Sequence, residues 1–122
     1  LIRMKILRRS NGRATVISID NVDEFTQYVI NSSTRVIVYF WADSNGLSRL
    51  LGSRLEEKIA VRDGDVVMVN VNIDWAGEIA LEWDVSTVPL IIEFKNGRST
   101  RILKGNASDD VLNSFIENIV DV

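Results

Sequence analysis

The chain has 122 residues, of which 14 are basic and 17 acidic, so its net charge is −3, and 46% of its residues are hydrophobic. This balance predicts one globular domain whose core needs no disulfide. No apolar run approaches the roughly 20 residues that span a bilayer, so we expect no membrane partner. The chain contains no cysteine and no histidine. That composition excludes thiol–disulfide exchange by its own side chains and histidine base catalysis, and it argues against a metal site of the zinc type.

The charge is distributed unevenly along the chain. Residues 1–13 carry five basic residues and no acid, whereas residues 14–122 hold nine basic and all 17 acidic residues. An Arg-rich, partly apolar segment is typical of mitochondrial targeting sequences, so we predict a basic N-terminal arm over 1–13 and a domain over 14–122. A basic extension without a targeting role and an ordered first strand remain open as alternatives. The acidic domain would repel phosphates, so we expect no nucleic-acid partner.

The first predicted elements are a strand and a helix. Residues 14–19 alternate in a way that favours a strand. Asp20 is a suitable helix N-cap, and Val22, Phe25 and Val29 then form one apolar helical face.

The next segment is the most informative one in the chain. Residues 36–41 form a continuous run of β-branched and aromatic side chains, which predicts a central strand buried on both faces. Residues 43–46 suit a turn and a helix start. Leu47, Leu51 and Leu55 then recur at helical spacing. In open α/β sheets the loop after such a strand is a common place for a functional site.

A third strand and a short helix follow. Residues 66–72 have a strong strand pattern, and Asp74 is a candidate cap for a short helix around residues 79–81. Two tryptophans lie near the ends of this helix. We expect Trp83 in the core and Trp75 on the surface.

The last part of the chain predicts a hairpin and a helix. Pro89, the only proline, begins a strand over 89–94, and Asn96-Gly97 is a hairpin turn before a returning strand over 99–103. Ser108 is a suitable cap for a C-terminal helix. The element order β-α-β-α-β-α-β-β-α predicts an α/β fold, in which a central mixed β-sheet is flanked by helices on both faces.

Two stretches resemble the thioredoxin family. Residues 40–42, Phe-Trp-Ala, precede Asn45-Gly46-Leu47-Ser48 at a helix start, where thioredoxins carry Cys-Gly-Pro-Cys. Residues 88–89, Val-Pro, precede a strand that ends in Phe-Lys-Asn-Gly and resemble the loop that holds the family's cis-proline. The resemblance covers about residues 14–120 and implies a thioredoxin-like fold with a cis Val88–Pro89 bond.

The resemblance also suggests a subtype. Residues 31–56 and 64–68 look most like mitochondrial-type thioredoxins. We therefore expect a mitochondrial location, with the cytoplasm as the alternative.

The reactive positions of the family are altered in this chain. By the resemblance, Asn45 and Ser48 stand where the two cysteines would be, and Tyr39 stands where the buried acid would be. An amide cannot attack a disulfide, and a serine hydroxyl cannot form one. We therefore predict no catalytic residue, no cofactor and a redox-inactive protein that is not an enzyme.

The substrate-binding surface of the family could persist without the thiols. In the resemblance, an extended peptide lies in a groove against the loop before the cis-proline and pairs with the backbone of Val88. We expect a protein or extended-peptide partner in a groove bordered by Trp41, Asn45, Gly46, Leu47, Trp75, Val88 and Pro89. Alternatively, Trp41 belongs to the core and Pro89 only begins a strand. Two other functions remain open: redox activity that depends on a partner's thiols, and a structural subunit of a complex.

Overall fold

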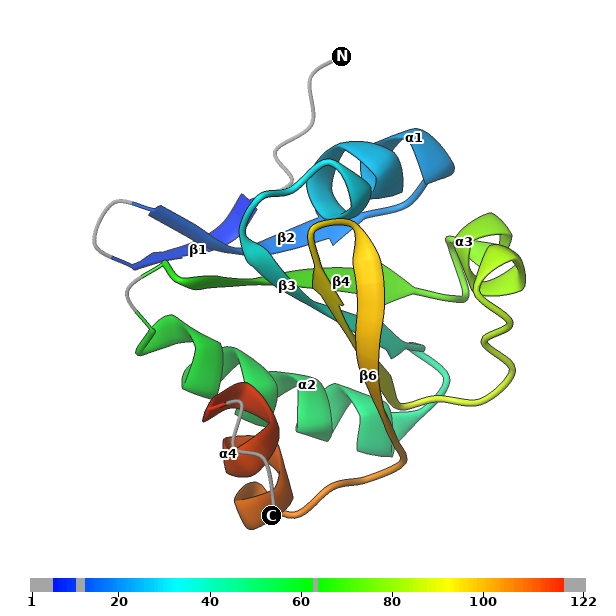
Figure 1. The fold of residues 1–122 in the computed structure, drawn as a ribbon. Coiled ribbons are helices and arrows are strands. Elements are labelled where there is room, and N and C mark those ends of the chain that lie inside the picture. The colour runs from blue at the N-terminus through cyan, green and yellow to red at the C-terminus, as the bar shows by residue number, and fades with distance from the viewer. Residues whose placement is uncertain (1–5, 11–12, 63, 118–122) are drawn as a thin grey trace.

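The computed structural model describes residues 6–10, 13–62 and 64–117 and shows a mixed, six-stranded sheet (Figure 1). The strand order is β1-β2-β4-β3-β5-β6. Strand β4 pairs in parallel with β2 and β3, and the other neighbours are antiparallel. The strands are β1 Ile6–Ser10, β2 Arg13–Ile19, β3 Arg35–Trp41, β4 Val66–Asn72, β5 Leu90–Lys95 and β6 Arg98–Lys104.

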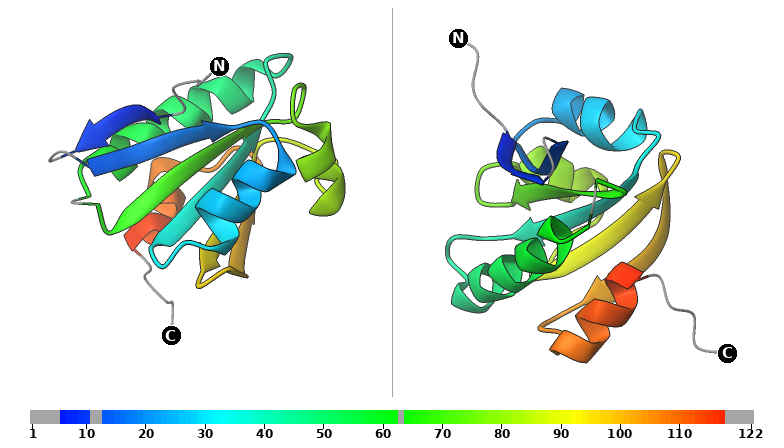
Figure 2. Two further views of the ribbon diagram at one scale, coloured as in Figure 1. Left: turned by 90° about the horizontal axis from the view of Figure 1, so that it is seen from above. Right: turned by 90° about the vertical axis from the view of Figure 1, so that its left-hand side faces the viewer.

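Helices cover both faces of the sheet, as predicted (Figure 2). One face packs against α1 Val22–Phe25, the π-helical turn η1 Thr26–Ile30 and α3 Gly77–Glu82. The other face packs against α2 Gly46–Ala60 and α4 Asp109–Glu117. Within the part of the chain that the structure describes, no helix combines the length and the apolar character needed to cross a membrane.

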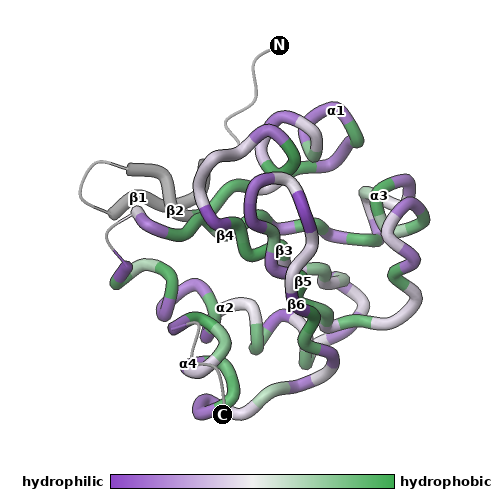
Figure 3. Tube along the Cα trace, in the orientation of Figure 1, coloured by the Kyte–Doolittle hydropathy of each residue, from purple (hydrophilic) through white to green (hydrophobic). Residues whose placement is uncertain are grey.

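Strand β3 is the central buried strand that its sequence predicts. Its five inner residues are buried, and successive side chains enter the two cores alternately. Val38 packs on the side of α1 and α3, whereas Ile37 and Tyr39 pack on the side of α2 and α4. The hydrophobic colour accordingly concentrates in the inner strands (Figure 3).

The N-terminal segment includes a strand. Strand β1 lies within the predicted basic arm and pairs with β2, which begins at Arg13. The ordered first strand that the sequence left open is therefore present over Ile6–Ser10. Residues 1–5 and 11–12 lie outside the described residues, and a targeting role for residues 1–13 stays a prediction.

The first helix differs from its prediction at its N-terminus and in its middle. Asn21, rather than Asp20, caps α1, because the Asn21 Oδ1 atom accepts the backbone N–H of Glu24 at 2.8 Å. The Asp20 N–H instead bonds the Glu24 carboxylate at 3.1 Å. The predicted single helix is also divided into α1 and η1.

Asp74 does not cap the short helix, contrary to the prediction. The residue before α3 is Ala76, which makes no side-chain cap bond. The Asp74 N–H bonds the Asn72 Oδ1 atom at 3.0 Å in the turn that follows β4. This turn directs the Asp74 carboxylate to the backbone of Ser44 instead.

The Asn-Gly hairpin is confirmed between β5 and β6. Asn96 and Gly97 both have positive φ, 52° and 78°, as such a turn requires. A Cβ on Gly97 would lie 2.5 Å from the Ile30 carbonyl oxygen. Only glycine therefore fits where the hairpin meets the end of η1.

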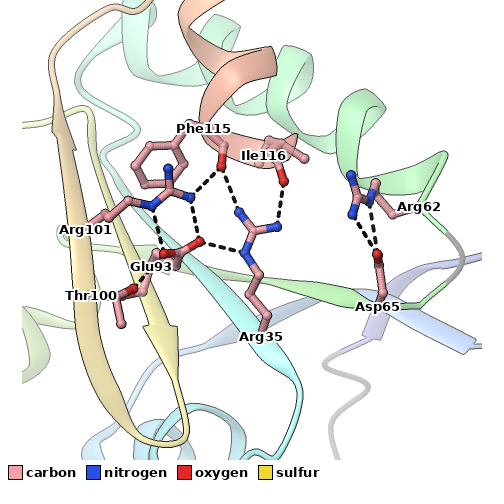
Figure 4. A network of polar contacts seen from close by, with 8 residues as sticks. All are labelled: Arg35, Arg62, Asp65, Glu93, Thr100, Arg101, Phe115 and Ile116. Carbon is pink, nitrogen blue, oxygen red and sulfur yellow. Dashed lines mark hydrogen bonds and ion pairs between the residues drawn. The ribbon is translucent and has the colours of Figure 1, made fainter. Parts of the chain in front are cut away.

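A buried ionic cluster surrounds Glu93 on β5 (Figure 4). The Glu93 side chain is only 1% exposed and accepts hydrogen bonds from Arg35 at 2.6 Å, Arg101 at 2.7 and 2.8 Å, and Thr100 at 2.6 Å. Burial by itself would raise the pKa of Glu93, but these hydrogen bonds outweigh it and lower the pKa to about 2. Glu93 is therefore ionised at neutral pH.

The same two arginines attach the C-terminal helix. Arg35 donates to the carbonyl oxygens of Phe115 at 2.7 Å and Ile116 at 2.6 Å, and Arg101 donates to that of Phe115 at 2.6 Å. These carbonyls lie in the last described turn of α4, where helix carbonyls commonly accept from side chains. The Arg101 guanidinium also lies 4.2 Å from the centroid of the Phe115 ring. The cluster thus links β3, β5 and β6 to the end of α4.

Candidate functional site

The predicted site residues lie at one end of the sheet. Strands β3 and β4 both end there, and β5 begins there, because Trp41 pairs with Asn72 and Phe40 pairs with Leu90 (Figure 1). Residues 45–47 follow β3, Trp75 follows β4, and residues 88–89 precede β5. The topology therefore brings the predicted positions into one region.

Hydrogen bonds tie the loops after β3 and β4 together. The Asp43 Oδ2 atom accepts from the Asn72 Nδ2 at 3.1 Å and from the indole Nε1 of Trp75 at 3.4 Å. The Asp74 carboxylate accepts the Ser44 N–H at 3.3 Å. Each loop thus supplies one carboxylate to the other. Asp43 was not identified from the sequence as a site residue, and Asp74 was considered only as a helix cap, although each follows the end of a predicted strand.

Apolar side chains are exposed on this region. The side chain of Trp75 is 75% exposed and that of Leu47 is 57% exposed, whereas Trp41 is half-buried and packs against the core. This half-buried position partly supports the alternative that Trp41 belongs to the core. Because the indole of Trp75 bonds Asp43, it is held in its exposed position.

The Val88–Pro89 peptide bond is cis, as the resemblance predicts. Pro89 is buried, and its carbonyl oxygen accepts the Gly105 N–H at 3.0 Å. Val88 is half-buried, and neither its N–H nor its carbonyl bonds the backbone of another described residue. The backbone of Val88 is thus available for pairing with an added strand. We call Trp41, Asn45, Gly46, Leu47, Trp75, Val88 and Pro89 the candidate binding surface.

Asn45 and Ser48, which stand where the resemblance places the two thiols, form hydrogen bonds at the start of α2. The Asn45 Oδ1 atom accepts the Ser48 N–H at 2.9 Å and caps the helix. Ser48 is fully buried, and its hydroxyl lies 2.7 Å from the Asn45 carbonyl oxygen and 3.1 Å from that of Ala42. The hydroxyl also accepts the Ala42 N–H at 3.3 Å. Ser48 is therefore a buried, hydrogen-bonded residue at the start of the helix.

Tyr39, which stands where the resemblance places a buried acid, is a neutral phenol. It is 1% exposed, its hydroxyl donates to the Ser48 carbonyl oxygen, and burial raises its pKa above the ordinary value. A Cβ on Gly52 would lie 3.0 Å from the Tyr39 ring, so α2 approaches the ring closely at a glycine. Asn45, Ser48 and Tyr39 together supply neither a thiolate nor an ionised base.

A pocket of about 200 Å³ lies beneath the start of α2. The Asn70 Oδ1 atom is buried there without a hydrogen-bond partner among the described residues. A pocket of this volume can hold a few waters or one small ring. Small residues on α2, including Gly52, leave this space unfilled. The amino-acid sequence alone did not indicate the pocket. The lining residues are Tyr39, Trp41, Ser48, Arg49, Gly52, Ser53, Glu56 and Asn70.

The described residues contain no group of three or more acidic, histidine or cysteine side chains that could hold a metal ion. The site consequently offers hydrogen bonds, exposed apolar side chains and one free backbone segment.

Comparisons with known proteins agree with the fold. The family described as Thioredoxin matches residues 16–118. The chain is 42% identical over 118 residues to "Probable thioredoxin-2" of Caenorhabditis elegans, covering 97% of this chain and 81% of that protein. It is 36% identical over 107 residues to "Thioredoxin, mitochondrial" of Bos taurus, covering 88% of this chain and 64% of the relative. Among solved structures, an N21Q mutant thioredoxin from Halobacterium salinarum NRC-1 has a TM-score of 0.76 at 20% identity, with 88% and 93% of the two chains covered.

Proposed function

The chain belongs to the thioredoxin family, and on this premise we propose that it is a redox-inactive member that binds an extended peptide or protein segment on the candidate binding surface. The proposal is supported by a contrast between two groups of residues in this region. Asn45 and Ser48 are bonded into the start of α2, whereas Leu47 and Trp75 are exposed. At the same end of the sheet, the backbone of Val88 makes no hydrogen bond to the backbone of another described residue.

The absence of thiols determines what the surface can do. Disulfide exchange requires an attacking thiolate, and the chain has no cysteine. Binding of an extended segment requires only backbone hydrogen bonds and pockets or patches for alternate side chains. Exposed tryptophan and leucine are suitable contacts, because a large aromatic side chain often contributes much of the binding energy.

The proposal is tested by selection from a library of random linear decapeptides against the purified chain. We expect enriched peptides whose affinity falls about tenfold or more in the Leu47→Ser and Trp75→Ala variants, because each removes an exposed apolar contact. The matched control is Val61→Ser, since Val61 is 84% exposed but lies just beyond the opposite end of α2. Peptides that bind all variants equally would refute the proposal.

An insulin-reduction assay separates this function from enzymatic alternatives. We expect the background rate with the chain alone. A rate above background only when a second thiol protein is added would favour activity that depends on a partner's thiols. Co-elution in a large complex, with no peptide selected, would favour a structural subunit.

We also propose a mitochondrial location. The proposal is supported by the bovine, rat and mouse relatives described as mitochondrial thioredoxins and by the basic character of residues 1–13. Imaging of the tagged full-length protein tests it, and a purely cytoplasmic distribution would contradict it.

A further inference from the structure

The candidate binding surface continues onto α3. Trp75 lies just before this helix, and Leu81 on the helix is 84% exposed. Hydrophobic and hydrophilic stretches lie next to each other along α3 (Figure 3). In Figure 1, α3 lies at the end of the sheet where β3 and β4 finish. Exposed apolar side chains are therefore present both just before α3 and on it, next along the chain to the surface that we propose to bind a peptide.

The charge around these apolar residues has a single sign. No lysine or arginine occurs between residues 63 and 94. The exposed acids on this side are Asp43, Asp74, Glu78, Glu82 and Asp84.

These acids are not neutralised by ion pairs within the described chain. The ion pairs among the described residues involve Glu93, Asp65, Asp109 and Glu117, and none of the five acids. The donors to Asp43 and Asp74 are a side-chain amide, an indole and a backbone N–H, all of them uncharged. The negative charge on this side consequently remains available to a partner.

The opposite side of the candidate binding surface is basic. A Cβ on Gly46 would lie 3.9 Å from the Arg49 guanidinium, and Lys104 pairs with Leu90 beside Pro89. The region is thus polarised, with acids toward α3 and cations toward α2 and β6. A bound segment would meet the five exposed acids on the side of α3 and of the loop after β3, and Arg49 and Lys104 on the other side.

We infer that the segment bound by this surface is cationic as well as apolar: its apolar residues cover Trp75 and Leu81, and its lysine or arginine residues face the acids of α3. The inference rests on the proposed function and specifies its partner. Opposite charges favour encounter and register, and like charges oppose binding. An exposed apolar patch rimmed by charge is typical of a protein interaction site. Nucleic acids and anionic membranes would be repelled by the same acids.

The composition of the selected decapeptides tests the inference. Among peptides that depend on Leu47 and Trp75, we expect lysine and arginine to be enriched about twofold or more over the starting library and acids to be depleted. Their affinity should fall as salt is raised. Peptides that depend on both residues but show no excess of basic residues would overturn the inference and leave the proposed function intact.

Paired charge variants localise the effect. Glu78→Gln with Glu82→Gln should abolish the enrichment and weaken the selected cationic peptides about fivefold. The control, Glu57→Gln with Asp110→Asn, removes the same charge from exposed positions on α2 and α4 and should change affinity less than about twofold. An equal loss in both variants would show attraction to net charge and would overturn the inference. If no peptide depends on Leu47 or Trp75, the proposed function fails as well.

Discussion

The start of α2 and the Glu93 cluster lie on the same face of the sheet but use buried polar groups differently. At the start of α2, Asn45, Ser48 and Tyr39 form hydrogen bonds between uncharged groups. Around Glu93, a buried carboxylate forms ion pairs with Arg35 and Arg101, whose side chains are 12% and 29% exposed. The comparison indicates that the ion pairs of the Glu93 cluster connect α4 to the sheet. The buried polar groups at the start of α2, the region that resembles a reaction centre, are instead uncharged and stabilise the loop before the helix.

The Glu93→Gln variant tests this difference between the two regions, and it has the largest expected effect on stability. It leaves Arg35 and Arg101 without their carboxylate, so we expect the free energy of unfolding to fall by about 3–5 kcal/mol. Urea unfolding measures the loss. The control is Asp109→Asn, because Asp109 pairs with Arg54 at an exposed site, where an ion pair contributes little. Equal losses in the two variants would show that the Glu93 cluster is no more important than a surface pair.

Lowering the pH should selectively remove the stability that the Glu93 cluster contributes. The Glu93 pKa is lowered from its ordinary value of 4.5 to about 2, so Glu93 contributes stability above pH 4.5 that is lost as the pH falls toward 2. The unfolding free energy of Glu93→Gln, measured from pH 5 to 2, should therefore fall less steeply than that of the wild type. Because the lowered pKa values of Asp65 and Asp109 act in both proteins, the difference between the two curves isolates Glu93. Parallel curves would contradict the assignment.

The uncharged region should respond to loss of the phenol more modestly. Tyr39→Phe removes the hydrogen bond to the Ser48 carbonyl oxygen and should cost about 1 kcal/mol. The raised pKa of Tyr39 means that its contribution is full below the unfolded-state pKa of about 10 and is lost at higher pH. Unfolding at pH 8 and 11 should therefore show a smaller difference between wild type and variant at pH 11. Tyr28→Phe on the opposite face is the control, and an equal effect of the two substitutions would refute the role of Tyr39.

The smallest effect is expected at the helix cap. Asn45→Ala should lower the unfolding free energy by about 0.5–1 kcal/mol, because the Ser48 N–H loses its acceptor. Asn45→Asp keeps a cap acceptor and should retain most of the stability. Thermal unfolding of the three proteins measures the series. An alanine variant as stable as the wild type would show that the cap contributes nothing here.

Local patterns in the sequence predict most of the fold. The apolar run of β3, the Asn96-Gly97 turn and the helical spacing of Leu51 and Leu55 each depend on neighbours a few residues away. The location of the site was also predictable, because parallel strands place the ends of β3 and β4 at one edge of the sheet.

Contacts between distant residues could not be predicted in this way. Arg35 is 58 residues from Glu93 and 81 residues from Ile116, so no local pattern shows the ionic cluster. Asp43 reaches Trp75 across two loops, and this contact explains why the indole is ordered although exposed. The cap at Asn21 was missed because Asp20 and Asn21 are both good capping residues and only the backbone geometry selects between them.

The close approach of α2 to Tyr39 links the residue at position 52 to the residue at position 39. With a Cβ at position 52 only 3.0 Å from the Tyr39 ring, a larger residue at 52 would require the phenol ring to shift, whereas a smaller residue at 39 would relieve this contact. Conversely, a smaller residue at 39 beside Gly52 would leave an unfilled space, in an interior where voids destabilise. Substitutions at 39 and 52 should therefore be non-additive: the effect of each on the free energy of unfolding depends on which residue occupies the other position.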